Sequence, residues 1–451
     1  MQIKGYKERT IDAKILAYLR IFGAVCVEGP KWCGKTWTCR HHAKSEFLVG
    51  DPAGNFQNRR LVQIDISSAF KGESPHLIDE WQEFPELWDA TRAYVDTAPE
   101  KGRFLLTGSS TPNRKGIMHS GTGRIASIRM LPMTLWESGF SDGTVSLKEL
   151  CDNKPLSVVH TRNPDLHEIA EWIVRGGWPG ALGISASDAV HVPREYIAQL
   201  LENDIHRIDN IRRDIHKVDL LLRSLARNES TTASIATLCS DISGTDGETV
   251  DSDTVSSYLN ALQRLFVIEN QKPFHANIRS SVRVKQSEKR HFCDPSLACA
   301  ILKLTPERLI GDLNFMGFLF EALVERDLRV YADSFGAQIM HYQDYSNREL
   351  DAVIEMENGD WAAVEIKLGA AQEDAAAANL IAIRNTIAKE PKGRPPKSLI
   401  VVLGRSAAAY TRPDGVHPMV STVRRPLQLS VLFRESMGFP SLGSPTTRHG
   451  M

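Results

Sequence analysis

The chain has 451 residues, which exceeds the size of one ordinary hydrophobic core, so we expect two or three domains. Its 42% hydrophobic and 24% charged residues are typical of a globular protein and exclude a disordered or fibrous one. The formal net charge of −1 gives no overall signature of a nucleic-acid binder, although a local basic face is compatible with that sum.

Residues 1–10 are polar and contain no apolar segment of the kind found in a secretory signal. No apolar stretch approaches the length of about 18 residues that a membrane span requires. The seven cysteines are scattered and form no Cys-x-x-Cys pair, so they indicate neither a disulfide framework nor a zinc site. We therefore expect a cytoplasmic protein with reduced thiols and no membrane contact.

A phosphate-binding motif follows an apolar strand predicted at residues 24–28. It matches the pattern G-x-x-x-x-G-K-[ST] and consists of Gly29, Pro30, Lys31, Trp32, Cys33, Gly34, Lys35 and Thr36. Backbone N–H groups of such a loop, together with the positive end of the following helix, bind phosphate. Lys35 is expected to reach the β- and γ-phosphates of ATP, and the Thr36 hydroxyl is expected to coordinate Mg²⁺.

A second apolar strand, predicted at residues 75–80, ends in two carboxylates. We expect Asp79 to hold the Mg²⁺ shell and Glu80 to polarise the attacking water. An apolar strand followed by Asp-Glu is common by itself, and it becomes specific when it is paired with the upstream loop. Together the two motifs predict an ATPase.

Two further candidates follow. A strand predicted at residues 103–108 leads to Ser109, and in AAA-type ATPases a polar group at this position senses the γ-phosphate. The alternative for Ser109 is a serine-rich turn. Arg124 lies in a glycine-rich loop before a strand predicted at 125–130. There it could act as an arginine finger at the nucleotide edge, in its own subunit or across a homo-oligomer boundary, or it could be an ordinary surface arginine.

These motifs resemble a prokaryotic family of predicted AAA-type ATPases that join this domain to a carboxy-terminal domain of uncharacterised function. The resemblance covers most of the chain and includes residues 29–36, 77–82, 106–109, 123–125, 133–135, 176–179, 202–205 and 365–367. It implies ATP binding, and it supplies no settled biological role.

The middle of the chain is predicted to contain two regions of different secondary structure. Residues 141–165 are rich in Ser, Gly, Asp and Pro and predict an irregular connection, and helical spacing follows from residue 166 to about residue 225. We expect residues 141–216 to form a helical lid or connector. Residues 217–300 predict three helices, at 217–227, 231–241 and 252–265, and then a β-hairpin, which is the pattern of a winged helix.

A winged helix would bind DNA through its third helix and its wing. On the third helix the candidates are Ser256, Asn260 and Arg264. The basic residues of the wing are His275, Arg279, Arg283, Lys285, Lys289 and Arg290. The alternative is a winged helix that only packs against the ATPase domain.

The last region predicts a nuclease-like α/β domain at residues 301–435. Strands predicted at 348–354 and 361–367 flank an Asn-Gly turn, and Glu365 and Lys367 lie on one face of the second strand. Asp351 before the hairpin and Glu-x-Lys after it resemble the PD-(D/E)xK nuclease superfamily. That resemblance implies Mg²⁺ binding by Asp351 and Glu365, with Glu321 completing the metal shell from a preceding helix, and orientation of water by Lys367.

The sequence thus predicts an α/β ATPase domain at residues 1–140, the two middle regions, a nuclease-like domain and a disordered tail at 436–451. Three functions remain open: an ATP-driven enzyme that processes DNA, a nucleotide-dependent switch with an inert carboxy-terminal domain, and a nucleic-acid-binding regulator with slow turnover.

Overall fold

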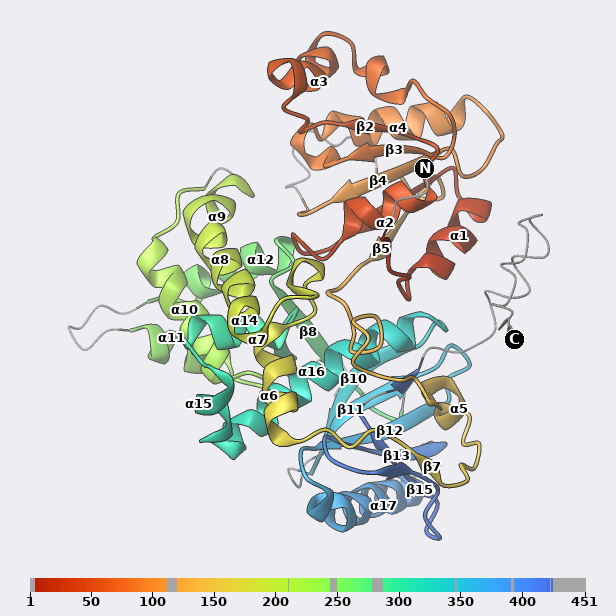
Figure 1. The fold of residues 1–451 in the computed structure, drawn as a ribbon, viewed down its shortest axis with the longest axis vertical. Helices are drawn as coiled ribbons and strands as arrows, with labels where there is room; N and C mark the ends of the chain where they lie inside the picture. Colours follow the sequence, from red (N-terminus) through yellow and green to blue (C-terminus); the bar gives the residue numbers. More distant parts are fainter. Residues whose placement is uncertain are drawn as a thin grey trace, which may run out of the picture.

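The structure, a computed structural model, describes residues 5–111, 120–209, 211–243, 250–277, 287–344, 346, 348–390, 393–421 and 423–424. Figure 1 shows an amino-terminal part with a central sheet, a helical middle part beside it, and a second sheet that contains the carboxy-terminal strands. No helix among these residues has both the length and the apolar character needed to cross a membrane.

The amino-terminal sheet consists of described strands that all run parallel, in the order β2-β3-β4-β1-β5. Their bounds are β1 Ala24–Glu28, β2 Ser45–Leu48, β3 His76–Asp79, β4 Phe104–Gly108 and β5 Ile125–Arg129. The central strands are almost wholly apolar because helices cover both faces of the sheet. One face packs on α1 (Asp12–Ile21) and α2 (Lys35–His42), and the other packs on α3 (Ala53–Ile64), η1 (Ile66–Phe70) and α4 (Glu86–Asp96).

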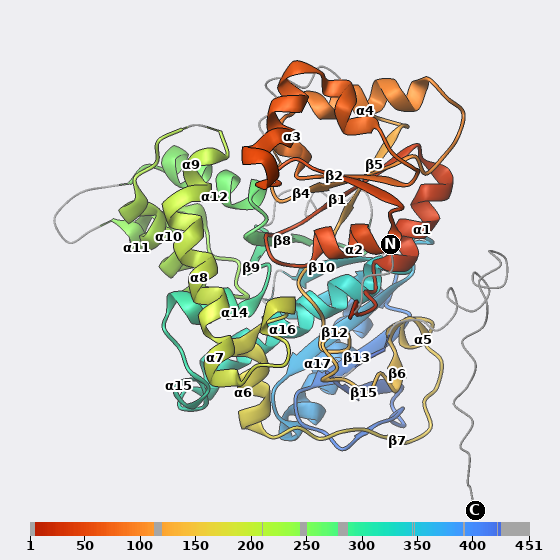
Figure 2. The same cartoon turned by 45° about the horizontal axis from the view of Figure 1, so that its top comes forward.

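The middle part is helical, as the apolar spacing predicts. Its helices are α6 Leu166–Arg175, η3 Pro179–Ala181, α7 Ala186–Ala189, α8 His191–Gln199, η4 Leu200–Asp204, α9 Ile205–Arg207, α10 Ile215–Arg227, α11 Ile235–Ile242, α12 Ser252–Arg264, α14 Pro295–Ile301 and α15 Pro306–Ile310. Figure 2 shows this helical part beside both sheets.

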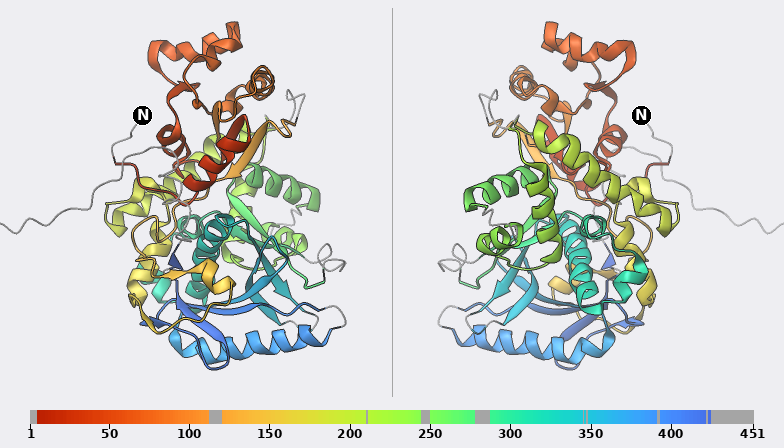
Figure 3. Two further views of the ribbon diagram at one scale, coloured as in Figure 1. Left: turned by 90° about the vertical axis from the view of Figure 1, so that its right-hand side faces the viewer. Right: turned by 90° about the vertical axis from the view of Figure 1, so that its left-hand side faces the viewer.

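The carboxy-terminal sheet is mixed and has the strand order β15-β13-β12-β11-β10-β8-β9. The strands are β8 Ile268–Pro273, β9 Lys289–Phe292, β10 Gln338–Gln343, β11 Glu349–Glu355, β12 Trp361–Lys367, β13 Ser398–Leu403 and β15 Val416–Val420. Alternate residues of the strands face two cores, one shared with α16 (Leu313–Asp333) and the other with α17 (Glu373–Lys389). Figure 3 shows α17 along the outer face of this sheet, away from the amino-terminal part.

The segment 141–165 is more ordered than a simple connection. It contains the short strands β6 (Val145–Ser146) and β7 (Val159–His160) and the helix α5 (Leu147–Cys151). The two strands pair with β16 (Val423–Arg424) and β14 (Ala408–Ala409), so the segment lies along the carboxy-terminal domain. The composition of the segment favours turns and therefore does not predict α5, whose residues 147, 150 and 151 are buried.

The three helices and the hairpin predicted at 217–300 are present, but the hairpin is not a free wing. β8 pairs antiparallel with β9 on one side and parallel with β10 on the other. One continuous core extends from the helical middle part to α16 and its face of the sheet. The hairpin therefore forms the end of the carboxy-terminal sheet. Arg279, Arg283 and Lys285 lie outside the described residues.

Candidate functional site

The phosphate loop joins the carboxyl end of β1 to the first turn of α2. Two positions require glycine. A Cβ atom on Gly29 would lie 2.0 Å from the carbonyl oxygen of Met130, and Gly34 has a φ of +104°. The loop is therefore a cradle of backbone that admits no side chain at these points, which fits close approach to phosphate.

The two motifs meet at the carboxyl edge of the sheet. The Thr36 hydroxyl donates a hydrogen bond to Asp79 Oδ1 at 2.8 Å, and the Thr107 hydroxyl donates to the same oxygen at 2.6 Å. Lys35 is only 4% exposed, and its Nζ donates to the carbonyl oxygen of Pro30 at 2.8 Å. Thr36 and Asp79 are thus placed together as a Mg²⁺ site would require, while the Lys35 ammonium rests on its own loop.

Glu80 is held in the left-handed region with a φ of +57°, and its backbone N–H donates to the Thr107 hydroxyl at 2.9 Å. Its carboxylate accepts hydrogen bonds from the Ser109 hydroxyl at 2.9 Å and from the Gln82 amide. Gln82 Nε2 also donates to Ser109 Oγ at 3.1 Å. These side chains orient the carboxylate from two sides. Thr107 and Gln82 are site residues that no motif predicts, although each lies within a segment that carries the family resemblance.

Other parts of the chain contact the loop as well. Lys31 Nζ lies 2.5 Å from Asp204 Oδ1 of the helical part, and the Trp32 ring meets Tyr196 edge-on. Arg9, 4% exposed, donates to the carbonyl oxygens of Cys33 and Leu131, at 2.8 Å each. Nothing in the polar sequence around Arg9 signals this contact.

Arg124 does not lie at the nucleotide edge of its own subunit. β5 runs parallel to β1, with Ile125 opposite Ala24 and Arg129 opposite Glu28, after which the phosphate loop begins. Arg124 therefore lies at the amino edge of the sheet, about 20 Å from Gly29 at the usual rise per strand residue. There its Nε donates to Asp96 Oδ1 at 2.8 Å.

The acids and the lysine predicted in the carboxy-terminal domain come together between β11 and β12. Lys367 Nζ lies 2.9 Å from Asp351 Oδ2 and 2.6 Å from Glu365 Oε2. Asp351 also accepts the backbone N–H of Ile366 at 2.7 Å, and Glu365 accepts from Asn379 Nδ2 at 2.7 Å. Both carboxylates are buried, so each depends on these partners.

Glu321 of α16 faces the same cluster, and its partner is Lys289 of β9, with Nζ 2.6 Å from Oε1. Burial raises the pKa of Glu321 to about 8 and that of Glu365 to about 7. Burial alone would raise the pKa of Asp351. The ammonium groups of Lys367 and Lys289 nevertheless hold this pKa below its ordinary value. The cluster thus holds three acids and two lysines, and its acids do not all ionise readily.

Two predicted DNA contacts have other roles. Lys289 is 3% exposed inside this cluster, so it cannot serve as a wing contact to DNA phosphates. Arg264 donates to Asp209 Oδ2 at 3.1 Å and to the carbonyl oxygen of Thr111 at 3.1 Å, so its guanidinium is already engaged. Ser256 and Asn260 are exposed on α12.

Metal binding by the carboxy-terminal acids finds no direct support in their arrangement. Within the described part of the chain, no group of three or more His, Cys, Asp or Glu side chains is placed to hold a metal ion. The acids are paired with lysines instead.

Comparison with protein families divides the chain into three parts. Residues 22–138 match the model of an AAA domain. Residues 166–308 and 316–421 match two domains of unknown function, DUF8612 and DUF4143. The amino-terminal part is therefore an AAA domain of the P-loop class, which implies nucleotide binding. Neither of the other two matches indicates a nuclease or a DNA-binding protein.

Two mycobacterial proteins are distant relatives: the uncharacterized proteins Rv2008c of Mycobacterium tuberculosis and Mb2031c of Mycobacterium bovis. Each is 23% identical over 354 residues, which are 78% of this chain and 71% of the relative. Among solved structures, the Walker-type ATPase PABY2304 of Pyrococcus abyssi is 15% identical, with 67% of this chain and 97% of that chain covered at a TM-score of 0.43. For the FIGL-1 AAA domain the identity is 14%, the coverage 57% and 83%, and the TM-score 0.23.

Proposed function

We propose that this protein hydrolyses ATP in a Mg²⁺-dependent reaction at the phosphate loop. The observation that carries the proposal is the meeting of Thr36 with Asp79, next to a Glu80 carboxylate held by Ser109 and Gln82. A bound Mg²⁺ would neutralise phosphate charge. Thr36 and Asp79 are the residues that would hold it.

The protein's own groups then divide the work. The backbone of residues 29–34 binds the phosphates, and Lys35 exchanges its contact with the Pro30 carbonyl for the β- and γ-phosphate oxygens. Glu80 orients the attacking water and accepts its proton. Ser109 and Gln82 hold the Glu80 carboxylate at the correct angle, and Ser109 is the group expected to report on the γ-phosphate.

The test compares Lys35→Ala and Glu80→Gln with the wild type, for binding of a fluorescent ATP analogue and for phosphate release. Lys35→Ala is expected to lose binding. Glu80→Gln is expected to keep binding and to lower kcat by about 100-fold or more. Glu86→Gln removes an exposed carboxylate from the first turn of α4 and serves as the matched control. Undiminished turnover in Glu80→Gln would overturn the proposed role.

A second function, cleavage of DNA, is favoured by the convergence of Asp351, Glu365, Lys367 and Glu321 in one buried cluster. We propose that these acids accept a divalent metal when Lys367 moves from them toward the scissile phosphate, and that DNA is the partner. The cluster holds one more acid than lysine, and a bound cation would favour the ionised forms of the Glu321 and Glu365 carboxyls, whose pKa values are raised by burial. The alternative is a nucleotide-dependent switch in which the lysines keep the cluster closed and inert.

The deciding experiment incubates labelled plasmid, linear and branched DNA with Mg²⁺ or Mn²⁺, with and without ATP. Asp351→Ala/Lys367→Ala should abolish cleavage, and Lys35→Ala should show whether ATP controls it. Glu357→Gln, an exposed change on the same hairpin, is the control. If the wild type cuts none of these DNAs while phosphate release persists, the nuclease function is wrong for them and the switch is the better account.

A further inference from the structure

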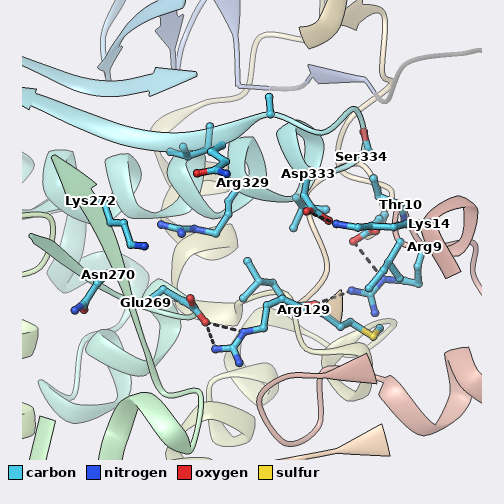
Figure 4. A pocket seen from close by; sticks show the side chains of 18 residues that line it. Arg9, Thr10, Lys14, Arg129, Glu269, Asn270, Lys272, Arg329, Asp333 and Ser334 are labelled. Atoms are coloured by element: carbon cyan, nitrogen blue, oxygen red, sulfur yellow. Dashed lines mark hydrogen bonds and ion pairs between the residues drawn. The ribbon is translucent and has the colours of Figure 1, made fainter. Parts of the chain in front are cut away.

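A cavity of about 280 Å³ lies between the AAA domain and the carboxy-terminal domain. Its walls come from the start of α1, the end of β5, β8, and the carboxyl end of α16 with the start of β10. Figure 4 shows the charged side chains that line it. This cavity lies outside the carboxy-terminal acid cluster and includes no residue of the phosphate loop, so neither proposed activity accounts for it.

Positive charge exceeds negative charge in the lining. Three cations are neutralised by acids of the same wall, in the pairs Arg9–Glu137, Lys14–Asp333 and Arg129–Glu269. Two cations remain. Arg329 reaches Glu325 through Nη2, and among the described residues Lys272 has no partner. In Figure 4 the Lys272 amine and the Arg329 guanidinium point toward one another from opposite walls of the cavity.

The lining also contains buried polar atoms that no described residue satisfies. These are the Nε of Arg329, the hydroxyl of Thr10 and the Oδ1 of Asn270. The Arg329 Nε–H and the Thr10 hydroxyl are donors, and a buried donor without a partner costs about 1–3 kcal/mol, so an anion that accepts from them would be stabilised; Asn270 Oδ1 is an acceptor and would not contact an anion. A guanidinium N–H beside a free ammonium is suited to an oxyanion.

We propose that this interdomain cavity binds a small phosphorylated ligand, with Lys272 and Arg329 as its main contacts. The volume lies at the lower limit of about 300–1,000 Å³ for ligand pockets, which favours a compact phosphate or diphosphate group over a large molecule. The ligand would connect two domains, because Lys272 and Arg329 belong to the carboxy-terminal domain while Arg129 ends a strand of the AAA domain.

The cavity also has a direct connection to the phosphate loop. Arg9 lines the cavity and donates to the Cys33 carbonyl oxygen within the loop. A ligand that forms a hydrogen bond with the Arg9 guanidinium would therefore weaken the hydrogen bond from Arg9 to the Cys33 carbonyl oxygen of the phosphate loop.

The test is isothermal titration calorimetry of the full chain with inorganic phosphate, pyrophosphate and AMP, in a Lys35→Ala background that disables the phosphate loop. We expect at least one probe to bind. Lys272→Gln should weaken that binding about tenfold, because an exposed side chain contributes one charge-assisted contact without supporting the fold. Arg329→Lys keeps a cation beside Glu325 but removes the Nε–H, and it should weaken binding as well.

Lys71→Gln is the control, since it removes the same charge from a side chain that is 73% exposed in the AAA domain. A response to pyrophosphate but not to AMP would indicate a diphosphate group, and the reverse would indicate a nucleotide. If no probe binds to the Lys35→Ala protein, or if Lys272→Gln and Lys71→Gln bind equally well, the proposal is overturned.

Discussion

The Glu80 carboxylate depends on two neighbours, and this dependence gives a prediction at the scale of single residues. Ser109→Ala removes the hydroxyl that donates to Glu80 at 2.9 Å and leaves Gln82 to hold the carboxylate alone. We expect kcat for ATP hydrolysis to fall about tenfold with little change in KM. The Ser109 hydroxyl positions Glu80, the general base of the reaction, and does not contact the adenine ring of ATP. Ser110→Ala is the control, and equal kcat values in the two variants would contradict the role of Ser109.

The buried Glu365 gives a prediction for pH. Its pKa of about 7 in the folded chain lies above the value of about 4.3 for an exposed glutamate. At low pH the carboxyl is protonated in both states and does not oppose folding. As the pH rises, the unfolded chain releases this proton first, so the stability that the group contributes is lost as the pH passes about 7.

We therefore expect the melting temperature of Glu365→Gln, measured in EDTA, to rise relative to that of the wild type as the pH increases from about 5.5 to about 8.5. Glu357→Gln, which changes an exposed carboxylate of the same hairpin, should follow the wild type throughout. A constant difference between Glu365→Gln and the wild type over this range would show that the carboxyl is not held protonated.

Local sequence patterns predict the residues of the nucleotide site because these residues belong to short sequence motifs. Lys35, Thr36 and Asp79 each follow directly from a motif, and the structure brings them together. Lys289 could not be predicted in the same way. Its surroundings in the sequence are basic, and only the pairing of β9 with β8 and the approach of α16 bury it beside Glu321.

At the scale of elements, α12 is fastened to the loop that follows β4. The Thr111 N–H donates a hydrogen bond to the Arg264 carbonyl oxygen at 2.9 Å, and the Arg264 guanidinium donates one to the Thr111 carbonyl oxygen. Because Ser109 lies two residues before Thr111, a movement that follows loss of the γ-phosphate would reach the end of α12.

Arg264→Ala should therefore lower kcat several-fold and speed up hydrogen exchange in residues 109–111, because half of the contact is lost. Gln263→Ala, an exposed change on the same helix, is the control. Unchanged exchange in the Arg264→Ala protein would mean that the backbone bond alone holds the loop.

The directions of the strands explain why two strands could be predicted from the sequence and why the place of Arg124 could not. The strands predicted at 24–28 and 75–80 are confirmed as β1 and β3, because continuous apolar runs are typical of parallel strands buried on both faces. The error concerns Arg124. The phosphate loop follows β1 and Arg124 precedes β5, so parallel strands must place them at opposite edges. This conclusion needed the sheet order, which no local pattern supplies.

At the scale of the whole molecule, the position of Arg124 limits its catalytic use to the site of a neighbouring subunit. Two inactive variants test this, since Glu80→Gln still provides Arg124 and Arg124→Ala still provides an intact site. If Arg124 acts across a subunit boundary, mixing them should restore part of the ATP hydrolysis that each lacks. Arg92→Ala, which also loses an ion pair with Asp96, should stay active by itself. Full activity of Arg124→Ala by itself would make Arg124 an ordinary surface residue, and an inactive Arg124→Ala that the mixture does not rescue would contradict a role across the boundary.

The pairing of β8 with β10 has a consequence for how such chains are inherited. The two domains of unknown function meet between residues 308 and 316, yet strands from the first complete the sheet of the second. A recombination event at this boundary would leave β10 with an open edge and would separate Glu321 from Lys289, a buried charge pair. Selection should therefore have kept the two segments together, so that they are passed on as one evolutionary unit.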